Sequence, residues 1–172
     1  MSEQKKYEFV PGDEIVIATG RTLKRIRALA AITAVSVVPG DLGGYIENEA
    51  NLDVSGNAWV SGNAWVSGNA QVSGNAQVSG DAWVSGNAWV SGNAWVSGNA
   101  DWLIVGPAKS SGQFTTAFRD EKIGVRVVCG CFTGTVREFS AAIEQTHSET
   151  QEHLQQYRLF CQLIAFSFGV EA

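Results

Sequence analysis

The sequence is short of charge and of long apolar runs, and each shortage excludes a class of protein. Only 17% of the 172 residues are charged, and 12 Lys and Arg against 17 Asp and Glu give a net charge of −5. Phosphate binding needs clustered cations, so we expect no nucleic-acid partner. No apolar stretch approaches the roughly 20 residues of a membrane helix, so we expect no membrane partner either.

Cysteine and histidine are also scarce. The three cysteines are Cys129, Cys131 and Cys161, an odd number, and residues 1–6 lead into no apolar signal-peptide core. Both features predict reduced thiols in a cytoplasm, that of a bacterium or of a phage-infected bacterium. The two histidines, His147 and His153, lie far from the repeated part of the chain.

What the sequence does contain is an internal repeat. From Val54 to Asp101, eight consecutive hexads read Val-Ser-Gly-Asn-Ala-X, in which only Asp81 for Asn and the last residue vary. The six-residue period excludes a heptad coiled coil, and a Gly in every copy excludes an α-helix. We interpret Ala-X-Val as a short strand and Ser-Gly-Asn as a corner, because Gly and Asn enter left-handed backbone conformations at low cost.

Three hexads then make one coil of a triangular prism. Residues 18 apart stack at about 4.8 Å, the spacing of strands in a sheet. Val and Ala side chains point inward, and the column Asn57, Asn75 and Asn93 is expected to form a hydrogen-bonded ladder. Valine, serine and alanine fall on the motif of the hexapeptide-repeat proteins, and this resemblance implies a left-handed parallel β-helix.

The outward positions carry five tryptophans and two glutamines. The 18-residue stacking places Trp59, Gln77 and Trp95 on one face, Trp65, Trp83 and Asp101 on the second, and Gln71 and Trp89 on the third. Flanking segments or a second subunit could cover these rings, or the rings could dock a partner protein or a flat ligand. Because Trp65 and Trp83 fall on adjacent coils, we expect their rings to stack.

The flanks predict two further modules. Residues 7–10, 14–19 and 23–29 have the pattern of short strands, and the chain from 46 to 52 is an irregular first coil. We therefore predict a mainly β protein with an N-terminal β cap over 1–45, the β-helix over 46–105 and a C-terminal α+β module over 106–172. In that module, strands are expected at 102–105, 114–118 and 125–132, and helices near 136–147 and 149–168, the first started by a capping box at Thr135 and Glu138.

Four cations lie close together before the repeat: Arg21, Lys24, Arg25 and Arg27. They favour a solvated strand face that pairs with Glu47 and Glu49, and an anion site is the alternative. No convincing catalytic set follows from the sequence. Hexapeptide-repeat acyltransferases use a cleft histidine, which is missing from the coils, and Cys129-Gly130-Cys131 is too closely spaced for a typical zinc site. We expect the three thiols to be buried and the protein to need neither metal nor cofactor.

Both flanks resemble one family found in bacteriophage and prophage genomes, whose members are described only as hexapeptide-repeat or polymer-forming proteins. The resemblance lies in residues 21–29, 40–47, Asn51-Leu52, 129–135, Glu138-Phe139 and Thr146-His147. Family members usually continue the last pair with Gly-Asp, where this chain has Ser148-Glu149. The resemblance implies a phage or prophage origin and transfers no activity.

Three functions from different classes follow as hypotheses. The first is a non-enzymatic phage accessory protein that binds a host component, with an antiviral defence system as the specific target. The second is a sponge for a nucleotide-like small molecule, or an acyltransferase-like enzyme, with its site in a cleft between subunits. The third is a structural oligomer. In each case we expect a homo-oligomer, a dimer or a trimer, in the bacterial cytoplasm.

Overall fold

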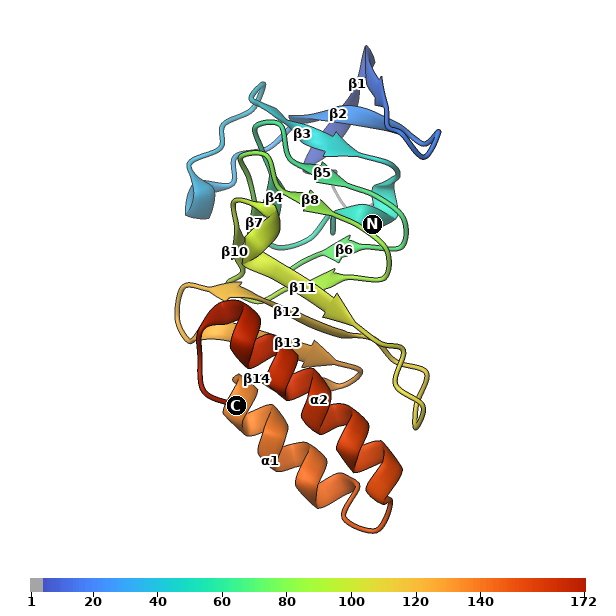
Figure 1. The fold of residues 1–172 in the computed structure, drawn as a ribbon. Helices are drawn as coiled ribbons and strands as arrows, with labels where there is room; N and C mark the ends of the chain where they lie inside the picture. The colour runs from blue at the N-terminus through green and yellow to red at the C-terminus, as the bar shows by residue number, and fades with distance from the viewer. Residues whose placement is uncertain (1–4) are drawn as a thin grey trace. The chain divides into compact units, whose positions relative to one another are not determined.

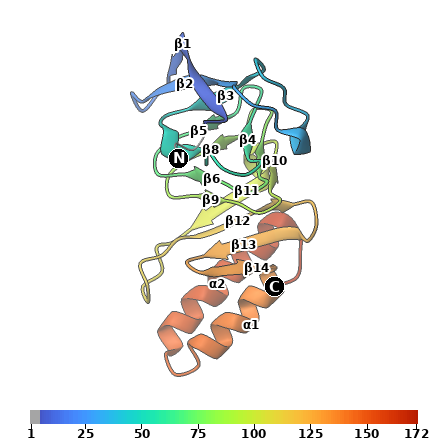
Figure 2. The same ribbon diagram turned by 180° about the vertical axis from the view of Figure 1, so that it is seen from behind.

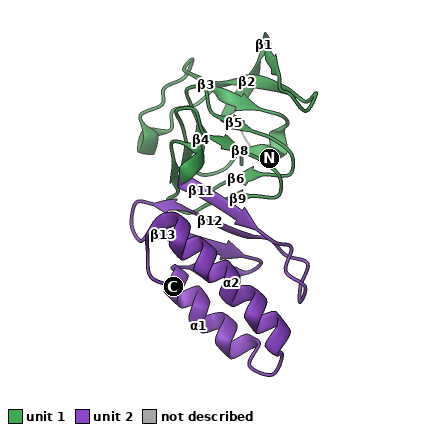
Figure 3. Cartoon of the chain, viewed as in Figure 1, with its two compact units in different colours: residues 1–100 green, residues 101–172 purple. Residues whose placement is uncertain are grey.

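The computed structural model describes residues 5–172. These residues form two compact units that divide between Ala100 and Asp101 (Figure 3). The repeat lies in the first unit, and each of its hexads from Trp59 to Val96 contributes a strand of two residues. These strands are β4 (Trp59–Val60), β5 (Trp65–Val66), β6 (Gln71–Val72), β7 (Gln77–Val78), β8 (Trp83–Val84), β9 (Trp89–Val90) and β10 (Trp95–Val96).

The short strands pair in parallel with the strand 18 residues away, as the repeat predicts. The three resulting sets are β4–β7–β10, β5–β8 and β6–β9. Backbone bonds join successive coils, for example from Trp59 N–H to the Ala76 carbonyl at 3.0 Å and from Ser61 N–H to the Val78 carbonyl at 2.9 Å. The Val side chains of these strands and the Ala side chains that precede the strands are buried inside the coil, at 0–1% exposed.

Each corner depends on its glycine. Gly74 has a φ of +68°, and a Cβ there would lie 3.1 Å from the backbone nitrogen of Gly92 in the next coil. Both the positive φ and the close approach of the coils therefore favour glycine. Beside the glycines, the predicted asparagine ladder forms: Asn57 donates to Asn75 at 2.8 Å and Asn75 donates to Asn93 at 3.4 Å.

The N-terminal segment forms an antiparallel meander that joins one face of the coils (Figure 1). Strand β1 (Tyr7–Val16) pairs with β2 (Thr22–Ala28), which pairs with β3 (Leu42–Ile46). Strand β3 then runs parallel to β5, with Tyr45 beside Trp65. The prediction of two separate strands before residue 20 was wrong, because the Pro11-Gly12 segment is an irregularity within β1 rather than a chain reversal. Single 3₁₀ turns are η1 (Thr33–Val35), η2 (Glu49–Asn51) and η3 (Asn99–Asp101).

The first regular coil, residues 54–71, is preceded by the irregular segment 45–53, whose backbone N–H groups reach only some of its carbonyls. Two side chains supply further donors. The buried Lys6 ammonium donates to the Ala58 carbonyl at 2.8 Å and to the Ser55 carbonyl at 3.2 Å. Asn51 Nδ2 donates to the carbonyls of Ala70 at 2.8 Å and Gly68 at 3.0 Å. On the remaining face the backbone of β3 supplies the donor, with Tyr45 N–H donating to the Ala64 carbonyl. An open sheet edge is closed in this way against pairing with other chains.

The second unit is a four-stranded antiparallel sheet with both helices on one face (Figure 1 and, from behind, Figure 2). The sheet order is β11 (Trp102–Val105), β12 (Thr115–Asp120), β13 (Gly124–Cys129) and β14 (Phe132–Gly134). Helix α1 (Val136–Thr146) begins at the predicted capping box, and α2 (Gln151–Phe168) follows. The core between the layers includes Val127, Phe139, Tyr157 and Ile164.

The strand predicted over 125–132 is two strands. Gly130 has a φ of +57°, so the chain turns there and β13 ends at Cys129. The two thiols therefore do not share the face of one strand. Cys131 is exposed, Cys129 is half-buried, and only Cys161 is buried as predicted.

We predict that Lys6→Met destabilises the first unit and changes how its stability depends on pH. The variant leaves the Ala58 carbonyl without its donor, which costs about 1–3 kcal/mol. Burial lowers the pKa of Lys6 to about 8 from its ordinary 10.5. Between these values the unfolded chain binds the proton and the folded chain does not, so this group makes the native state more stable as pH rises.

Urea unfolding followed by tryptophan fluorescence measures this, since five of the six tryptophans lie in the first unit. The gap between wild type and Lys6→Met should widen from about pH 8 to about pH 10. A gap that is constant over this range contradicts the assigned burial of the ammonium.

Candidate binding surface

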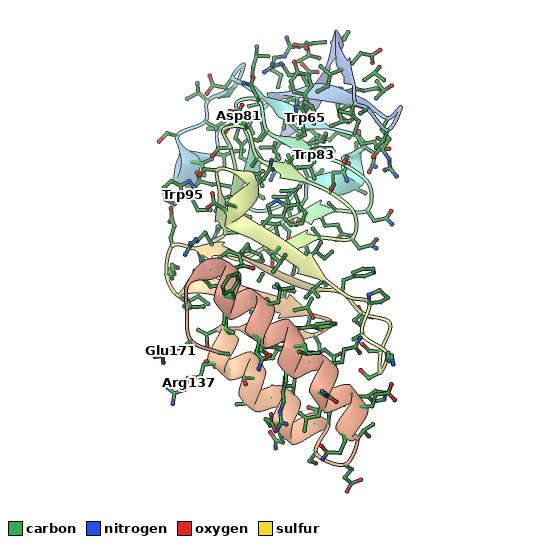
Figure 4. All side chains as sticks on the ribbon, viewed as in Figure 1. Trp65, Asp81, Trp83, Trp95, Arg137 and Glu171 are labelled. Atoms are coloured by element: carbon green, nitrogen blue, oxygen red, sulfur yellow. The ribbon has the colours of Figure 1, made fainter. Side chains whose placement is uncertain are left out.

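The outward tryptophans differ sharply in exposure. Trp83, Trp89 and Trp95 are 38%, 45% and 53% exposed, whereas Trp59 is only 3% exposed. Trp65 is half-buried. The exposed rings thus belong to the last three strands of the repeat, one on each strand set. Figure 4 labels two of them, Trp83 and Trp95. The expectation that Trp59 forms part of the surface was wrong: it lies in the outward column beside Gln77, but other residues cover it.

An aromatic column runs along one face of the coils. Tyr45, Trp65 and Trp83 occupy paired positions of β3, β5 and β8. The centroids of the two indole rings are 5.6 Å apart and the rings are inclined by 63°, so they meet edge to face rather than stacked as expected. The ring quadrupole favours this arrangement. At the other end of the column, the Arg25 guanidinium lies 4.4 Å from the centroid of the Tyr45 ring.

The four predicted cations of β2 and its turn do not gather around one point. Arg21 pairs with Glu47 at 2.8 Å, Arg25 with Asp13 at 2.9 Å, and Arg27 with Glu8. Lys24 Nζ lies 5.5 Å from the centroid of the Phe9 ring. Glu47 is thus a partner, as the sequence suggests, while Glu49 pairs with Lys5 instead. Each of the three arginines has a carboxylate counter-charge.

Arg21 and Trp83 border a shallow cavity of about 330 Å³. Its other lining residues come from two corners of the repeat and from the turn that follows β1: Ser67, Gly68, Asn69, Ser85, Gly86, Asn87, Ile17 and Thr19. Beside it, Gly68 N–H donates to Glu47 Oε2 at 2.6 Å. This backbone bond, with help from Arg21, lowers the pKa of the Glu47 carboxyl. The cavity therefore joins an aromatic ring, hydroxyl and amide groups, and a cation that is paired with an ionised carboxylate.

Two more cavities flank the repeat. One of about 450 Å³ lies beside Gln71 and Trp89 and is bordered by Glu49 and Asp53. Another, of about 260 Å³, lies between Trp59 and the segment that contains Val37 and Leu42. The tryptophan columns thus border hollows whose walls come partly from the N-terminal segment.

The histidines and cysteines lie in the second unit. The His147 ring stacks on Tyr157 with the ring centroids 5.1 Å apart, and His153 meets His147 edge-on at 5.8 Å. Burial raises the pKa of the Cys161 thiol to about 11, so this thiol is protonated at neutral pH. Among residues 5–172, no three His, Cys, Asp or Glu side chains gather as metal ligands would. Neither α1 nor α2 has the length and apolarity to cross a membrane.

Comparison with known proteins places the repeat in a structural class. Residues 54–68, 70–86, 76–92 and 84–98 match the family model of the YdcK Beta solenoid repeat. No curated protein matches the chain. The chain is therefore a mainly β protein with a β-solenoid repeat and a helical C-terminal part.

Sequence reasoning missed the residues that close the first coil, Lys6 and Asn51. Lys6 lies in a stretch with no repeat or motif, so no signal marks it. Asn51 could have been found, because it lies 18 residues before Asn69 and thus continues an asparagine column of the repeat.

Trp59 and Trp95 offer a matched pair of substitutions, because both rings lie in one outward column beside Gln77. Trp59→Ala removes a buried ring and should lower the free energy of unfolding by about 3–5 kcal/mol. Trp95→Ala removes a half-exposed ring and should cost less than about 1 kcal/mol, in the range of surface substitutions. Urea unfolding measures both. Equal costs would show that Trp59 is not covered.

Proposed function

We propose that this chain is a phage or prophage accessory protein without enzymatic activity, which binds a component of the bacterial host in the cytoplasm. A left-handed parallel β-helix serves as its rigid scaffold. The specific role in this proposal is the neutralisation of an antiviral defence system. The observation that carries the proposal is the exposure of three tryptophans on a hydrogen-bonded scaffold, with 38%, 45% and 53% of their surface open.

Exposed tryptophans on a stiff frame are suited to protein recognition. Interface residues with the largest binding energies are enriched in tryptophan and arginine. The tryptophans belong to strands that backbone hydrogen bonds join from one coil to the next. Little conformational entropy is therefore lost when these rings bind a partner. The side chain of Trp83 has Arg21 nearby, across the 330 Å³ cavity, which adds a cation to the aromatic surface.

The phage origin rests on the resemblance of both flanks to a phage and prophage family. The residues of that resemblance include the packed segment Gly43-Gly44, where a Cβ on Gly44 would lie 2.5 Å from the Ala64 carbonyl oxygen. They also include the capping residues Thr135 and Glu138 of α1. These positions build the fold, so the family resemblance supports a shared architecture, and the host partner is inferred from the exposed surface.

A second candidate function is the capture of a small molecule. The cavity beside Trp83 favours it, since an indole face, serine hydroxyls and asparagine amides could contact a flat polar ligand such as a nucleotide. Native mass spectrometry of protein purified from host cells discriminates the two functions. A bound mass of a few hundred daltons supports ligand capture, and a stoichiometric host protein supports the first proposal.

The test of the first proposal is a pull-down from the natural host with Trp83, Trp89 and Trp95 all changed to alanine. The triple variant should lose the captured host protein, because the exposed aromatic area is gone. Gln77→Ala is the matched control, at the same outward position of a central coil, and should retain the partner. Single tryptophan variants then locate the face that binds.

A partner that remains at full stoichiometry on the triple variant contradicts the assignment of this surface. If Trp65→Ala and Trp83→Ala instead convert an oligomer into monomers and no partner is found, a structural oligomer replaces the binding proposal. Circular dichroism of each variant shows whether the fold is retained.

A further inference from the structure

The cavity beside Trp83 has walls of two chemical kinds. One wall is the Trp83 ring, which the neighbouring Trp65 ring meets at 63° with the ring centroids 5.6 Å apart (Figure 4). The other walls are hydroxyl and amide groups from two corners of the repeat, together with the turn that follows β1. At about 330 Å³ the cavity is at the small end of ligand sites, which span roughly 300 to 1,000 Å³, so it can hold one ring rather than an extended molecule.

The corner side chains keep hydrogen-bonding capacity beside the cavity. Ser67 lines it and is only 3% exposed, and within residues 5–172 its hydroxyl has no hydrogen-bond partner. Buried polar groups are hydrogen-bonded in most proteins, so this hydroxyl is available to a ligand. Asn69 Nδ2 donates to Asn87 Oδ1 at 3.0 Å, and this bond uses neither the Asn69 carbonyl oxygen nor the Asn87 NH₂ group. A ligand in the cavity therefore meets both donors and acceptors.

The charges beside the cavity disfavour an anionic ligand. A phosphate would bind to a guanidinium and to backbone N–H groups at a glycine corner. Here both kinds of donor already bind one carboxylate, because Arg21 Nη1 lies 2.8 Å and the Gly68 nitrogen 2.6 Å from Glu47 Oε2. The bond from Gly68 lowers the pKa of Glu47, so this carboxylate is ionised at neutral pH and repels a second anion. The ligand that fits this cavity is therefore uncharged.

We propose that this cavity binds an uncharged sugar ring of glucose configuration, either as a free sugar or as one unit of a glycan. The hydroxyls of such a ring are equatorial, so each of its faces presents C–H groups, whose slight positive charge suits the negative face of an indole. The hydroxyls both donate and accept, as the serine and asparagine side chains of the corners require. The inference rests on the second candidate function, the capture of a small molecule, and gives the chemical class of that molecule.

NMR titration of the full chain with glucose and with cellotriose, a β-1,4-linked glucose trimer, tests the proposal. The six tryptophans give six indole N–H signals, and the spectrum of Trp83→Phe identifies the signal of Trp83. We expect both sugars to shift this signal with dissociation constants of about 1–10 mM. The signal of Trp95, an exposed ring on another strand set, should not move. Tighter binding of cellotriose than of glucose assigns the site to a glycan, and equal constants assign it to a free sugar.

Two substitutions probe the two kinds of wall, with saturation-transfer NMR on the sugar protons as the measurement. Trp83→Ala should weaken glucose binding by at least tenfold, because the aromatic wall is lost. Ser67→Ala should weaken it by about threefold or more, because one hydrogen bond is lost. Trp95→Ala is the matched control, since it removes an exposed ring that does not line this cavity, and it should leave binding unchanged. Circular dichroism should show that all three variants retain the fold.

A Trp83 signal that neither sugar moves at about 20 mM overturns the proposal, and so does glucose binding that Trp83→Ala leaves unchanged. Adenosine monophosphate, titrated in the same way, separates this failure from a failure of small-molecule capture. If it shifts the Trp83 signal at a lower concentration than glucose does, the sugar is the wrong ligand and nucleotide capture is supported instead. The capture of a host protein is measured separately by the pull-down, so either proposal can fail without the other.

Discussion

Backbone hydrogen bonding between residues about 18 apart is the constraint on which the first unit depends. Each coil satisfies its amides on the next coil, as in the 2.9 Å bond from Trp65 N–H to the Ala82 carbonyl. This register brings the coils to strand spacing. At the positive-φ position of each corner the repeat has glycine, and the interior positions hold Val and Ala. The same register also determines the outward columns, because every sixth side chain must leave the coil. The positions of the outward tryptophans thus follow from the backbone hydrogen bonds between successive coils.

The carbonyls of the first regular coil must be capped. The segments that cap them also determine which of the outward tryptophans are covered. At the first coil the carbonyls are closed by the Lys6 ammonium, the Asn51 amide and the backbone of β3. The segments that bring these donors into place also lie near the early outward positions: Trp59 is covered, and Trp65 is half-buried beside Tyr45. The later strands carry the exposed rings. The N-terminal segments that cap the first coil thus also cover the early tryptophans. The exposed tryptophans, and with them the candidate binding surface, therefore lie on β8, β9 and β10.

The repeat made the strands, corners, stacking register and asparagine ladder predictable, because one short motif occurs eight times and each copy has to satisfy the same geometry. The helices were predictable from the capping box at Thr135 and from the helical spacing of the apolar residues Leu154, Tyr157, Cys161, Ile164 and Phe168. The differences in tryptophan exposure could not be predicted from the sequence. Trp59 and Trp95 have identical hexads and differ only in the long-range contacts that cover them. The exposure of Leu159, Leu163 and Phe166 on α2 was not predictable for another reason: apolar side chains beside a core stripe have the same sequence pattern as further core residues. The turn at Gly130, within an apolar run, was missed likewise.

The most direct test of this account is amide hydrogen exchange within the repeat. The amides of Trp59, Trp65, Gln71 and Gln77 all donate to carbonyls of the next coil. If the coils form one hydrogen-bonded stack, these four amides exchange only when the first unit unfolds, and they report one common opening free energy equal to that of its urea unfolding. Opening free energies that differ widely among the four, or exchange as fast as that of an unstructured chain, would contradict a rigid scaffold and with it the proposed presentation of the tryptophans.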